Sequence, residues 1–432
     1  MARVRNVRWG VISVVAGSVG ILLALEVSAT RLGFEGPSRS FLHDFVFGPK
    51  RGPGLWAALA LAMVGLGKSE RIRCLLLAAG IDLVFFLGRY SAGTRPTFGN
   101  GALIVLVGLG GWAAWRWQGD RRADALKGVA IGLLLTMATK VSDTWLRITA
   151  ITQPHVLDEY VATADRSLGS PAWLVGRMVE ASGDVGHLIL QTVYIELPVA
   201  AIVVAIYQLR RGWPTHHLVR SFLAIGVIGP VCYVLFPVVG PAFAFGGLGK
   251  HWAVADIWPA IDHVSMHPNV IRFDRLTPRN CMPSLHTAWA VAIFIHSRRS
   301  PAWLRHFGAF WLVATLTATL GFGYHYGVDL VAGVIFALTI ESGLRDPERG
   351  WGWFRWRLVG GGAVTLAALL LSYRYLAAPL GEVPMVSGPL LLAIVSTMVV
   401  SFHATFFAES GTVTAGILRP GPAFAAGSST TA

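Results

Sequence analysis

Apolar residues gather in runs of about 20 positions along the chain, and short stretches rich in Arg, Gly and Pro separate the runs. A helix of that length crosses the hydrocarbon core of a bilayer, where every backbone N–H and C=O must be bonded within the protein. The pattern therefore predicts an all-α fold, a polytopic transmembrane helical bundle with about 12 spans. The expected spans are Val11–Thr30, Leu55–Gly67, Ile72–Gly88, Gly101–Trp117, Ala125–Trp145, Val185–Tyr207, Val219–Val239, Ser284–His296, Trp303–Gly323, Val328–Ile340, Leu358–Tyr373 and Met385–Phe407.

The composition excludes a soluble globular protein, because 54% of the residues are hydrophobic and only 14% are charged. The net charge of +13 does not indicate a nucleic-acid partner, because the basic residues lie in short clusters between the expected spans. With 12 spans and both termini in the cytoplasm, the inner segments carry the larger share of Lys and Arg, as membrane insertion favours. We therefore expect a multi-pass protein of the plasma membrane.

Four charged residues fall inside expected spans: Glu26, Asp82, Lys140 and Glu196. A charge is costly in lipid, so each side chain is expected to face the bundle interior or a wet cavity. Asp82 and Lys140 have opposite charges and could pair with each other. Glu196 is either paired in the same way or, since Pro198 follows it, marks a broken helix.

The stretch Arg279–Gly333 carries the residues that point to chemistry. Pro283 and Ser284 precede His286 and predict a helix start with Ser284 as the N-cap. His325 and Asp329 are four residues apart, so on a helix they share one face and the carboxylate can hold the ring. The expected spans place both histidines and Asp329 at helix ends on the outer face. A helix N-terminus beside a histidine is suited to binding an anion such as phosphate.

Two long segments are expected as loops on the outer face. Ser142–Asp184 is acidic, whereas Gly240–Met282 is basic and leads directly into Pro283. The arginines of the basic loop are suited to holding a phosphate group next to the histidines; they are Arg272, Arg275 and Arg279. The chain has only three cysteines, which indicates neither a disulfide framework nor a zinc site, and Cys281 is expected to be a small filler.

The motifs in this stretch resemble those of the type 2 phosphatidic acid phosphatase superfamily. Its second motif, PSxH, is matched by Pro283, Ser284 and His286, and the HxxxD end of its third motif is matched by His325 and Asp329. The two histidines are 39 positions apart. The usual Ser-Arg of the third motif is replaced by Ala318-Thr319, and the Lys…Arg-Pro first motif is missing upstream. These departures, together with the strings LFPVVGP and CMPSLHTAW, look more like the inositol phosphorylceramide synthase branch.

The resemblance implies a six-helix catalytic core and an integral membrane lipid phosphotransferase or phosphatase acting at the extracytoplasmic face. His325 would be the nucleophile that becomes phosphohistidine, Asp329 would orient it, and His286 would be the general acid and base. The substrate phosphate would be bound by Ser284, Arg279, Arg275 and Arg272. The substrate would be a membrane lipid phosphate, with water or a polyol such as inositol as the acceptor. No metal and no cofactor is expected.

Three regions follow from this assignment: residues 1–120 as an N-terminal extension of about four spans, 121–345 as the catalytic core, and 346–432 as two further spans and a tail whose composition predicts disorder. Two other functions stay open. One is a lipid transporter whose charged residues line a pathway, and the other is a non-catalytic relative that only binds phospholipid. Retention of His286, His325 and Asp329 argues against the second.

Overall fold

The computed structural model describes residues 2–49, 52–245, 267–271, 277–345 and 351–407, and most of these residues are helical. One two-residue antiparallel pair, β1 (His155–Val156) with β2 (Asn269–Val270), is the exception to an all-α fold among them. The N-terminal elements are α1 (Ala2–Arg31), α2 (Pro37–Val46), α3 (Gly52–Ala62), η1 (Met63–Gly65), α4 (Lys68–Ser91), α5 (Asn100–Arg116) and α6 (Gly119–Thr152). The central elements are α7 (Asp158–Asp165), η2 (Arg166–Leu168), α8 (Pro171–Ala181), α9 (Gly183–Ile195), α10 (Leu197–Leu209), α11 (Leu218–Leu235), α12 (Pro241–Ala244), α14 (Leu285–Ser297), α15 (Ala302–Gly321) and α16 (Gly327–Leu344). The C-terminal elements are α17 (Trp353–Tyr375), α18 (Ala377–Glu382) and α19 (Pro384–Phe406).

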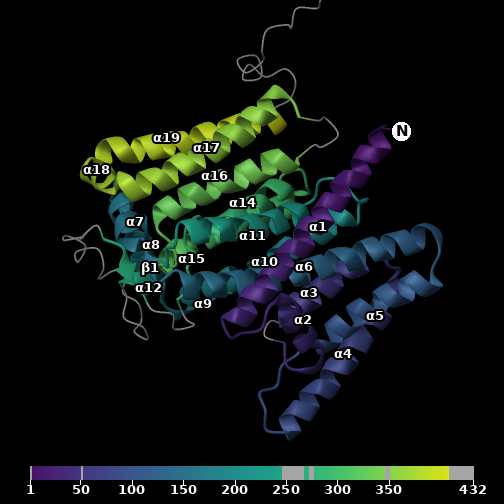
Figure 1. Cartoon of the computed structure of the whole chain (residues 1–432). Coiled ribbons are helices and arrows are strands. Elements are labelled where there is room, and N and C mark those ends of the chain that lie inside the picture. The colour runs from purple at the N-terminus through teal and green to yellow at the C-terminus, as the bar shows by residue number, and fades with distance from the viewer. Residues whose placement is uncertain (1, 50–51, 246–266, 272–276, 346–350, 408–432) are drawn as a thin grey trace, which may run out of the picture.

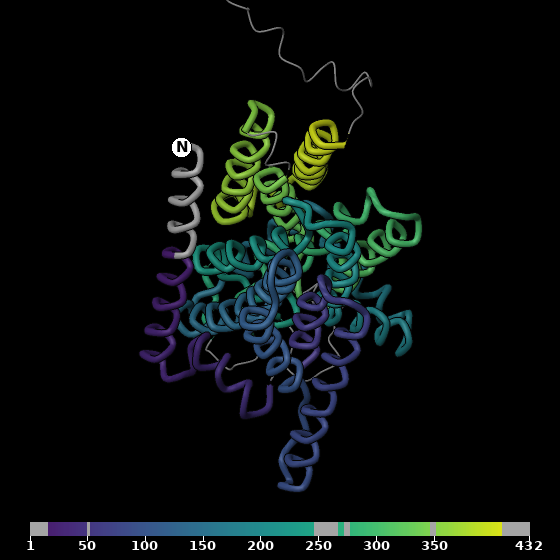
Figure 2. Tube along the Cα trace, turned by 90° about the vertical axis from the view of Figure 1, so that its right-hand side faces the viewer, coloured from purple at the N-terminus to yellow at the C-terminus, as the bar shows by residue number. Residues whose placement is uncertain are grey.

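The N-terminal helices form a lobe beside the main bundle, and α4 with α5 projects away from it in both views (Figures 1 and 2). The core of this lobe is apolar and joins α3, α5 and α6 through residues such as Leu59, Leu106 and Val129. Helix α6 also packs on α11 of the main bundle, where the Ser142 hydroxyl donates to the Gly226 carbonyl at 3.2 Å. The long helix α6 therefore connects the lobe to the bundle.

The charged side chains inside the lobe have partners within the lobe. The Asp82 carboxylate accepts from the backbone N–H groups of Gly99 and Gly101 at 2.8 and 2.7 Å and from the Trp56 indole at 2.9 Å. Lys140 instead forms a buried ion pair with Asp44. The suggested pairing of Asp82 with Lys140 is thus wrong, because backbone donors already satisfy Asp82.

Helices α14 and α16 run parallel at the centre of the main bundle. They begin together, since the Ser284 N–H donates to the Asp329 carbonyl at 3.2 Å, and they end together, since His296 contacts Glu341. A Cβ at Gly333 would lie 2.6 Å from the Ser284 carbonyl oxygen, so the close approach of the two helices requires glycine there. We call the end where both helices begin the site end, and the opposite end the far end.

The C-terminal helices cover one side of α16, as the upper layer of Figure 1 shows. Helix α18 joins α17 to α19 at the site end and packs on α7 and η2. A Cβ at Gly388 would lie 2.3 Å from the Ser167 carbonyl oxygen, which shows how closely α19 approaches this region. The C-terminal helices therefore support α7, which in turn contacts the site described below.

The prediction of a helical membrane protein is confirmed, but the count of about 12 spans is not. Every expected span falls on helical residues, yet within the described residues only five helices are long and apolar enough to cross a membrane. A sixth span results if the bent pair of α9 and α10 counts as one. Several expected spans are too short or too charged for this, for example α14 with 13 residues.

Two further expectations are decided by the structure. The helix is interrupted at Glu196, and α9 and α10 are bent by 55° relative to each other. Of the two alternatives for Glu196, the structure therefore shows the broken helix. The acidic segment Ser142–Asp184 is not a loop. Its residues continue α6 and then form β1, α7, η2 and α8 and begin α9.

Candidate active site

Helix α14 begins at the predicted cap. The Ser284 hydroxyl accepts from the Thr287 backbone N–H at 3.3 Å and from the Thr287 hydroxyl at 3.0 Å, and it is fully buried. This geometry confirms Ser284 as the N-cap. His286 is the second residue of the helix and is only partly buried, so its ring lies at the edge of the bundle core.

His325 and Asp329 meet at the start of α16. The Nδ1 atom of His325 lies 3.4 Å from Oδ2 of Asp329, and both side chains are buried. His325 itself sits in the turn before the helix, where its backbone N–H donates to the Thr319 carbonyl of α15 at 3.2 Å. The carboxylate also accepts from the Tyr326 N–H at 2.8 Å. Burial lowers the pKa of His325 to about 4, so its ring is neutral near pH 7.

The two histidines are neighbours although 39 positions separate them in the sequence. Their ring centroids are 6.3 Å apart. The His286 ring stacks on Tyr194, with centroids 4.0 Å apart and planes inclined by 18°. Tyr194 is the penultimate residue of α9, directly before the break at Glu196. The broken helix therefore supplies the aromatic side chain that fixes the orientation of His286.

Cys281 is part of this site, whereas the sequence predicted only a small filler. Its sulfur lies 2.5 Å from Oδ2 of Asp329 and 3.4 Å from Nδ1 of His325. The thiol is fully buried, and burial raises its pKa, so it is protonated and can donate to the carboxylate. The thiol therefore shares the Asp329 oxygen that faces the histidine.

Two buried aspartates of α7 hold the backbone around the site. Asp158 accepts from the N–H groups of Val239 and Gly240 at 3.0 and 2.9 Å and from the Tyr326 hydroxyl at 3.0 Å. Asp165 accepts from the Val328 N–H at 3.0 Å, in the first turn of α16. The sequence indicated only an acidic loop here. No local pattern reveals these contacts, since Asp158 and Tyr326 are 168 residues apart.

Of the three arginines proposed for phosphate binding, Arg279 is the one that lies within the described residues. Arg279 is fully buried, and its guanidinium donates to the carbonyl oxygens of Gln153, Thr277 and Ile271. This geometry fixes the segment before Pro283 and does not support direct phosphate binding by Arg279. Arg272 and Arg275 lie outside the described residues.

The arrangement brings together a neutral imidazole with a carboxylate on its Nδ1 and a second imidazole at the start of a helix. The Nε2 atom of His325 is the nitrogen left for substrate, because Nδ1 faces Asp329 and Cys281. The first backbone N–H groups of α14 add partial positive charge at the same end. Two imidazoles, a carboxylate and a helix N-terminus thus lie within one small region, which is a candidate active site.

Comparison with known families divides the chain into two parts. Residues 7–148 match a domain of unknown function (DUF5933), and residues 160–341 match the PAP2 superfamily. No curated protein and no solved structure matches the chain. The second match includes His286, His325 and Asp329. Residues 160–341 are therefore similar to the PAP2 superfamily, and the long apolar helices indicate a membrane protein.

Proposed function

We propose that the protein is a membrane-embedded lipid phosphotransferase or phosphatase that works through a phosphohistidine intermediate on a lipid phosphate ester. The observation that carries the proposal is the buried pair of His325 and Asp329 next to His286, where α14 and α16 begin. The superfamily match over residues 160–341 supports the reaction class. A non-catalytic binding protein would not need a neutral, carboxylate-oriented imidazole beside a second histidine.

In the first step, the Nε2 lone pair of His325 attacks phosphorus and the bond from phosphorus to the leaving oxygen breaks. The proton on Nδ1 stays between His325 and Asp329, whose carboxylate stabilises the positive ring that forms. Protonated His286 donates its proton to the leaving oxygen. The products of this step are the alcohol or lipid leaving group and phosphohistidine at position 325.

In the second step, an acceptor hydroxyl attacks the phosphohistidine while neutral His286 takes the acceptor's proton. Water as acceptor gives a phosphatase, and a polyol such as inositol gives a phosphotransferase. The likeness of LFPVVGP and CMPSLHTAW to the inositol phosphorylceramide synthase branch favours the polyol. Tyr194 and Tyr324, whose ring centroids are 5.0 Å apart beside His286, add hydroxyl groups and ring faces next to this position.

The phosphate oxygens need donors for their developing charge. We assign this role to the first N–H groups of α14 after Ser284 and to Arg272 and Arg275. Arg279 then acts indirectly, because its bonds to three carbonyl oxygens hold the chain that leads into Pro283. The Ser284 hydroxyl acts in the same indirect way through the helix cap.

The site end is proposed to face the outside of the cell, with both termini in the cytoplasm. A cysteine introduced at the exposed His267 should then react with a membrane-impermeant thiol reagent added to intact cells. A cysteine at the exposed Arg298, beyond the C-terminal end of α14, should react only after the membrane is opened. Unsubstituted protein controls for the native cysteines. Reversed labelling of the two positions would contradict the proposed orientation.

The proposed function is tested by incubating purified protein with a panel of phosphate-labelled lipids, with and without inositol. The panel includes phosphatidic acid, a prenyl diphosphate and phosphodiester phospholipids. Release of phosphate or its transfer to inositol is expected for one class, in wild type and in His403→Ala, a control on an exposed histidine. Turnover of none of the lipids would contradict the proposal.

A lipid transporter is the second candidate, and one observation favours it. Helices α9 and α10 form a span broken by 55° next to the site, as in transporters that bind substrate between half-helices. It is the one bent pair found among the described residues, whereas transporters usually repeat the break in a second half. Movement of a labelled lipid across the membrane of vesicles that contain the protein, without any change in the phosphate group of the lipid, would support this candidate.

A further inference from the structure

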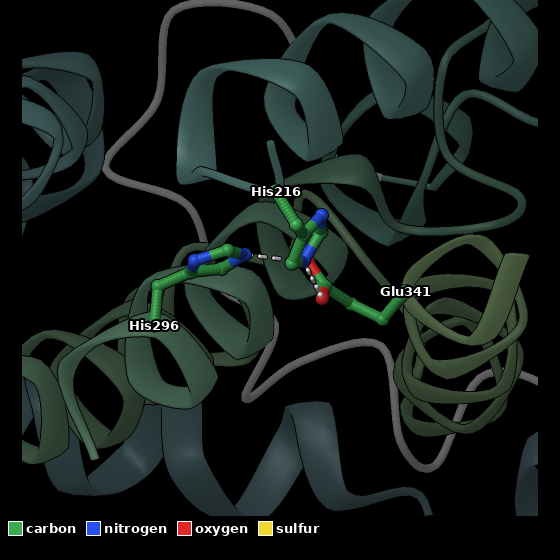
Figure 3. A group of neighbouring side chains, drawn as sticks. All are labelled: His216, His296 and Glu341. Carbon is green, nitrogen blue, oxygen red and sulfur yellow. Dashed lines mark hydrogen bonds and ion pairs between the residues drawn. The ribbon is translucent and has the colours of Figure 1, made fainter. Parts of the chain in front are cut away.

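A second group of buried titratable side chains lies at the far end of α14 and α16 (Figure 3). His296 is in the last turn of α14, Glu341 is in the last turn of α16, and His216 precedes α11. The side chains are 9%, 2% and 0% exposed for His216, His296 and Glu341. His296 is ten residues after His286 and Glu341 is twelve after Asp329. Helical rise makes these separations about 15 and 18 Å, so this group is separate from the candidate active site.

The two histidines direct the same ring nitrogen at one carboxylate. Nε2 of His216 lies 3.1 Å from Oε2 of Glu341, and Nε2 of His296 lies 3.0 Å from Oε1. Figure 3 shows the rings converging on the carboxylate from two sides. The three possible ligand atoms all lie within 4.8 Å of one another. In a tetrahedral site with bonds of about 2.0–2.2 Å, ligand atoms are about 3.3–3.6 Å apart, so only small shifts would be needed.

We propose that His216, His296 and Glu341 bind a divalent first-row transition-metal ion, for which Zn²⁺ is the first candidate. Two imidazoles and one carboxylate are a donor set that zinc uses, with a fourth position left for water. Imidazole nitrogens also favour zinc over Mg²⁺ and Ca²⁺, which prefer oxygen ligands. The ion would connect the segment before α11 to the far ends of the two helices that carry His286 and Asp329.

The Gln208 side chain beside His296 must change its orientation when a metal ion binds. The Gln208 amide accepts from the Leu218 N–H at 3.0 Å through Oε1, and its Nε2 lies 3.0 Å from Nδ1 of His296. This amide orientation places the His296 proton on Nε2, where it is shared with Glu341. A metal on Nε2 displaces that proton to Nδ1, so the Gln208 amide must turn to accept it. The affinity for the ion is therefore controlled in part by Gln208.

A positive charge also competes for the carboxylate. Nη1 of Arg345 lies 3.8 Å from Oε2 of Glu341. The Arg345 guanidinium also lies over the Phe407 ring, 4.5 Å from the ring centroid. The ring gives the guanidinium a second stabilising contact when the ion neutralises Glu341. Neutralising position 345 should accordingly strengthen metal binding.

The test is a titration of full-length protein, purified in detergent and treated with a chelator, with Zn²⁺ against a chromophoric competitor. Elemental analysis measures the stoichiometry, and Co²⁺ absorption reports the geometry. We expect one ion per chain and a tetrahedral Co²⁺ spectrum. Glu341→Gln and His216→Asn should each weaken binding by about 10²-fold or more, and Gln208→Glu should tighten it by about tenfold, since its carboxylate accepts from Nδ1–H.

The controls separate this site from the candidate active site. Asp329→Asn removes one member of the other buried group, Cys281, His325 and Asp329, and should leave Zn²⁺ binding unchanged. Size-exclusion profiles show whether each variant is folded. His216 lies outside the helices, so His216→Asn is the variant expected to disturb folding least. The inference is overturned if wild type binds no stoichiometric ion, if Glu341→Gln binds as wild type does, or if binding is lost in Asp329→Asn instead.

Discussion

His325→Ala is expected to lower kcat on the lipid substrate by about 10⁴-fold or more, with little change in protein yield. The substitution removes the imidazole whose Nδ1 faces Asp329, which is the nucleophile of the proposed mechanism. Loss of a nucleophile that works as a unit with its partners typically removes nearly all of the chemical step. The measurement is kcat for release or transfer of labelled phosphate.

His403→Ala is the matched control, because it makes the same chemical change on α19 at an exposed position. It should keep wild-type kcat. If His325→Ala instead keeps more than about a tenth of wild-type kcat, the bound phosphate is not attacked by this residue, and the nucleophile must be water or another side chain.

His286→Ala is expected to have an effect that depends on the leaving group. With an alkoxide leaving group, kcat should fall by about 10²–10⁴-fold, because no proton reaches the departing oxygen. With a nitrophenolate, which hardly needs protonation, phosphohistidine formation should fall by less than about tenfold. The measurement is the rate with each of the two esters in pre-steady-state experiments. The ratio of the two rates is taken within each variant, so the nitrophenyl ester is the reference for the alkyl ester.

The comparison between esters also distinguishes proton transfer from a loss of structure. Removing the ring that stacks on Tyr194 could shift α9, and such a shift would slow both esters by the same factor. Tyr194→Phe keeps a stacked ring and should preserve the wild-type ratio between esters. Equal losses for the two esters in His286→Ala would refute the assignment of His286 as general acid.

The helices of this chain could be predicted from the sequence because apolar runs are a local property. Val219–Val239 was expected to be helical, for example, and α11 occupies Leu218–Leu235. The number of membrane crossings could not be predicted in the same way. Helix α14 is apolar but has only 13 residues and is surrounded by protein, so its composition reflects burial as much as lipid contact.

The core of the candidate site was predictable where its residues are close in sequence. Ser284 caps α14, and His325 meets Asp329 four residues later, both within one helical turn. The supporting contacts were not predictable, because the fold creates them. Cys281 reaches Asp329 across 48 residues, and Asp158 reaches Tyr326 across 168.

Pairing of charges was the least predictable feature. Lys140 and Asp82 have opposite charges but do not pair. Lys140 forms an ion pair with Asp44, and Asp82 accepts hydrogen bonds from backbone N–H groups such as that of Gly101. The buried group of His216, His296 and Glu341 gave no sequence signal, because 125 residues separate His216 from Glu341. A regular spacing of residues in the sequence reveals metal ligands only when the ligands lie on the same helix, strand or loop.

The central claim, a phosphohistidine at position 325, is tested most directly by rapid quenching of the protein with phosphate-labelled substrate. An acid-labile, base-stable label is expected on wild type. With the nitrophenyl ester, a comparable label is expected on His286→Ala, and a weaker label on Asp329→Asn, whose nucleophile is present but poorly oriented. No label should form on His325→Ala with any substrate. A stable label on His325→Ala would contradict the account.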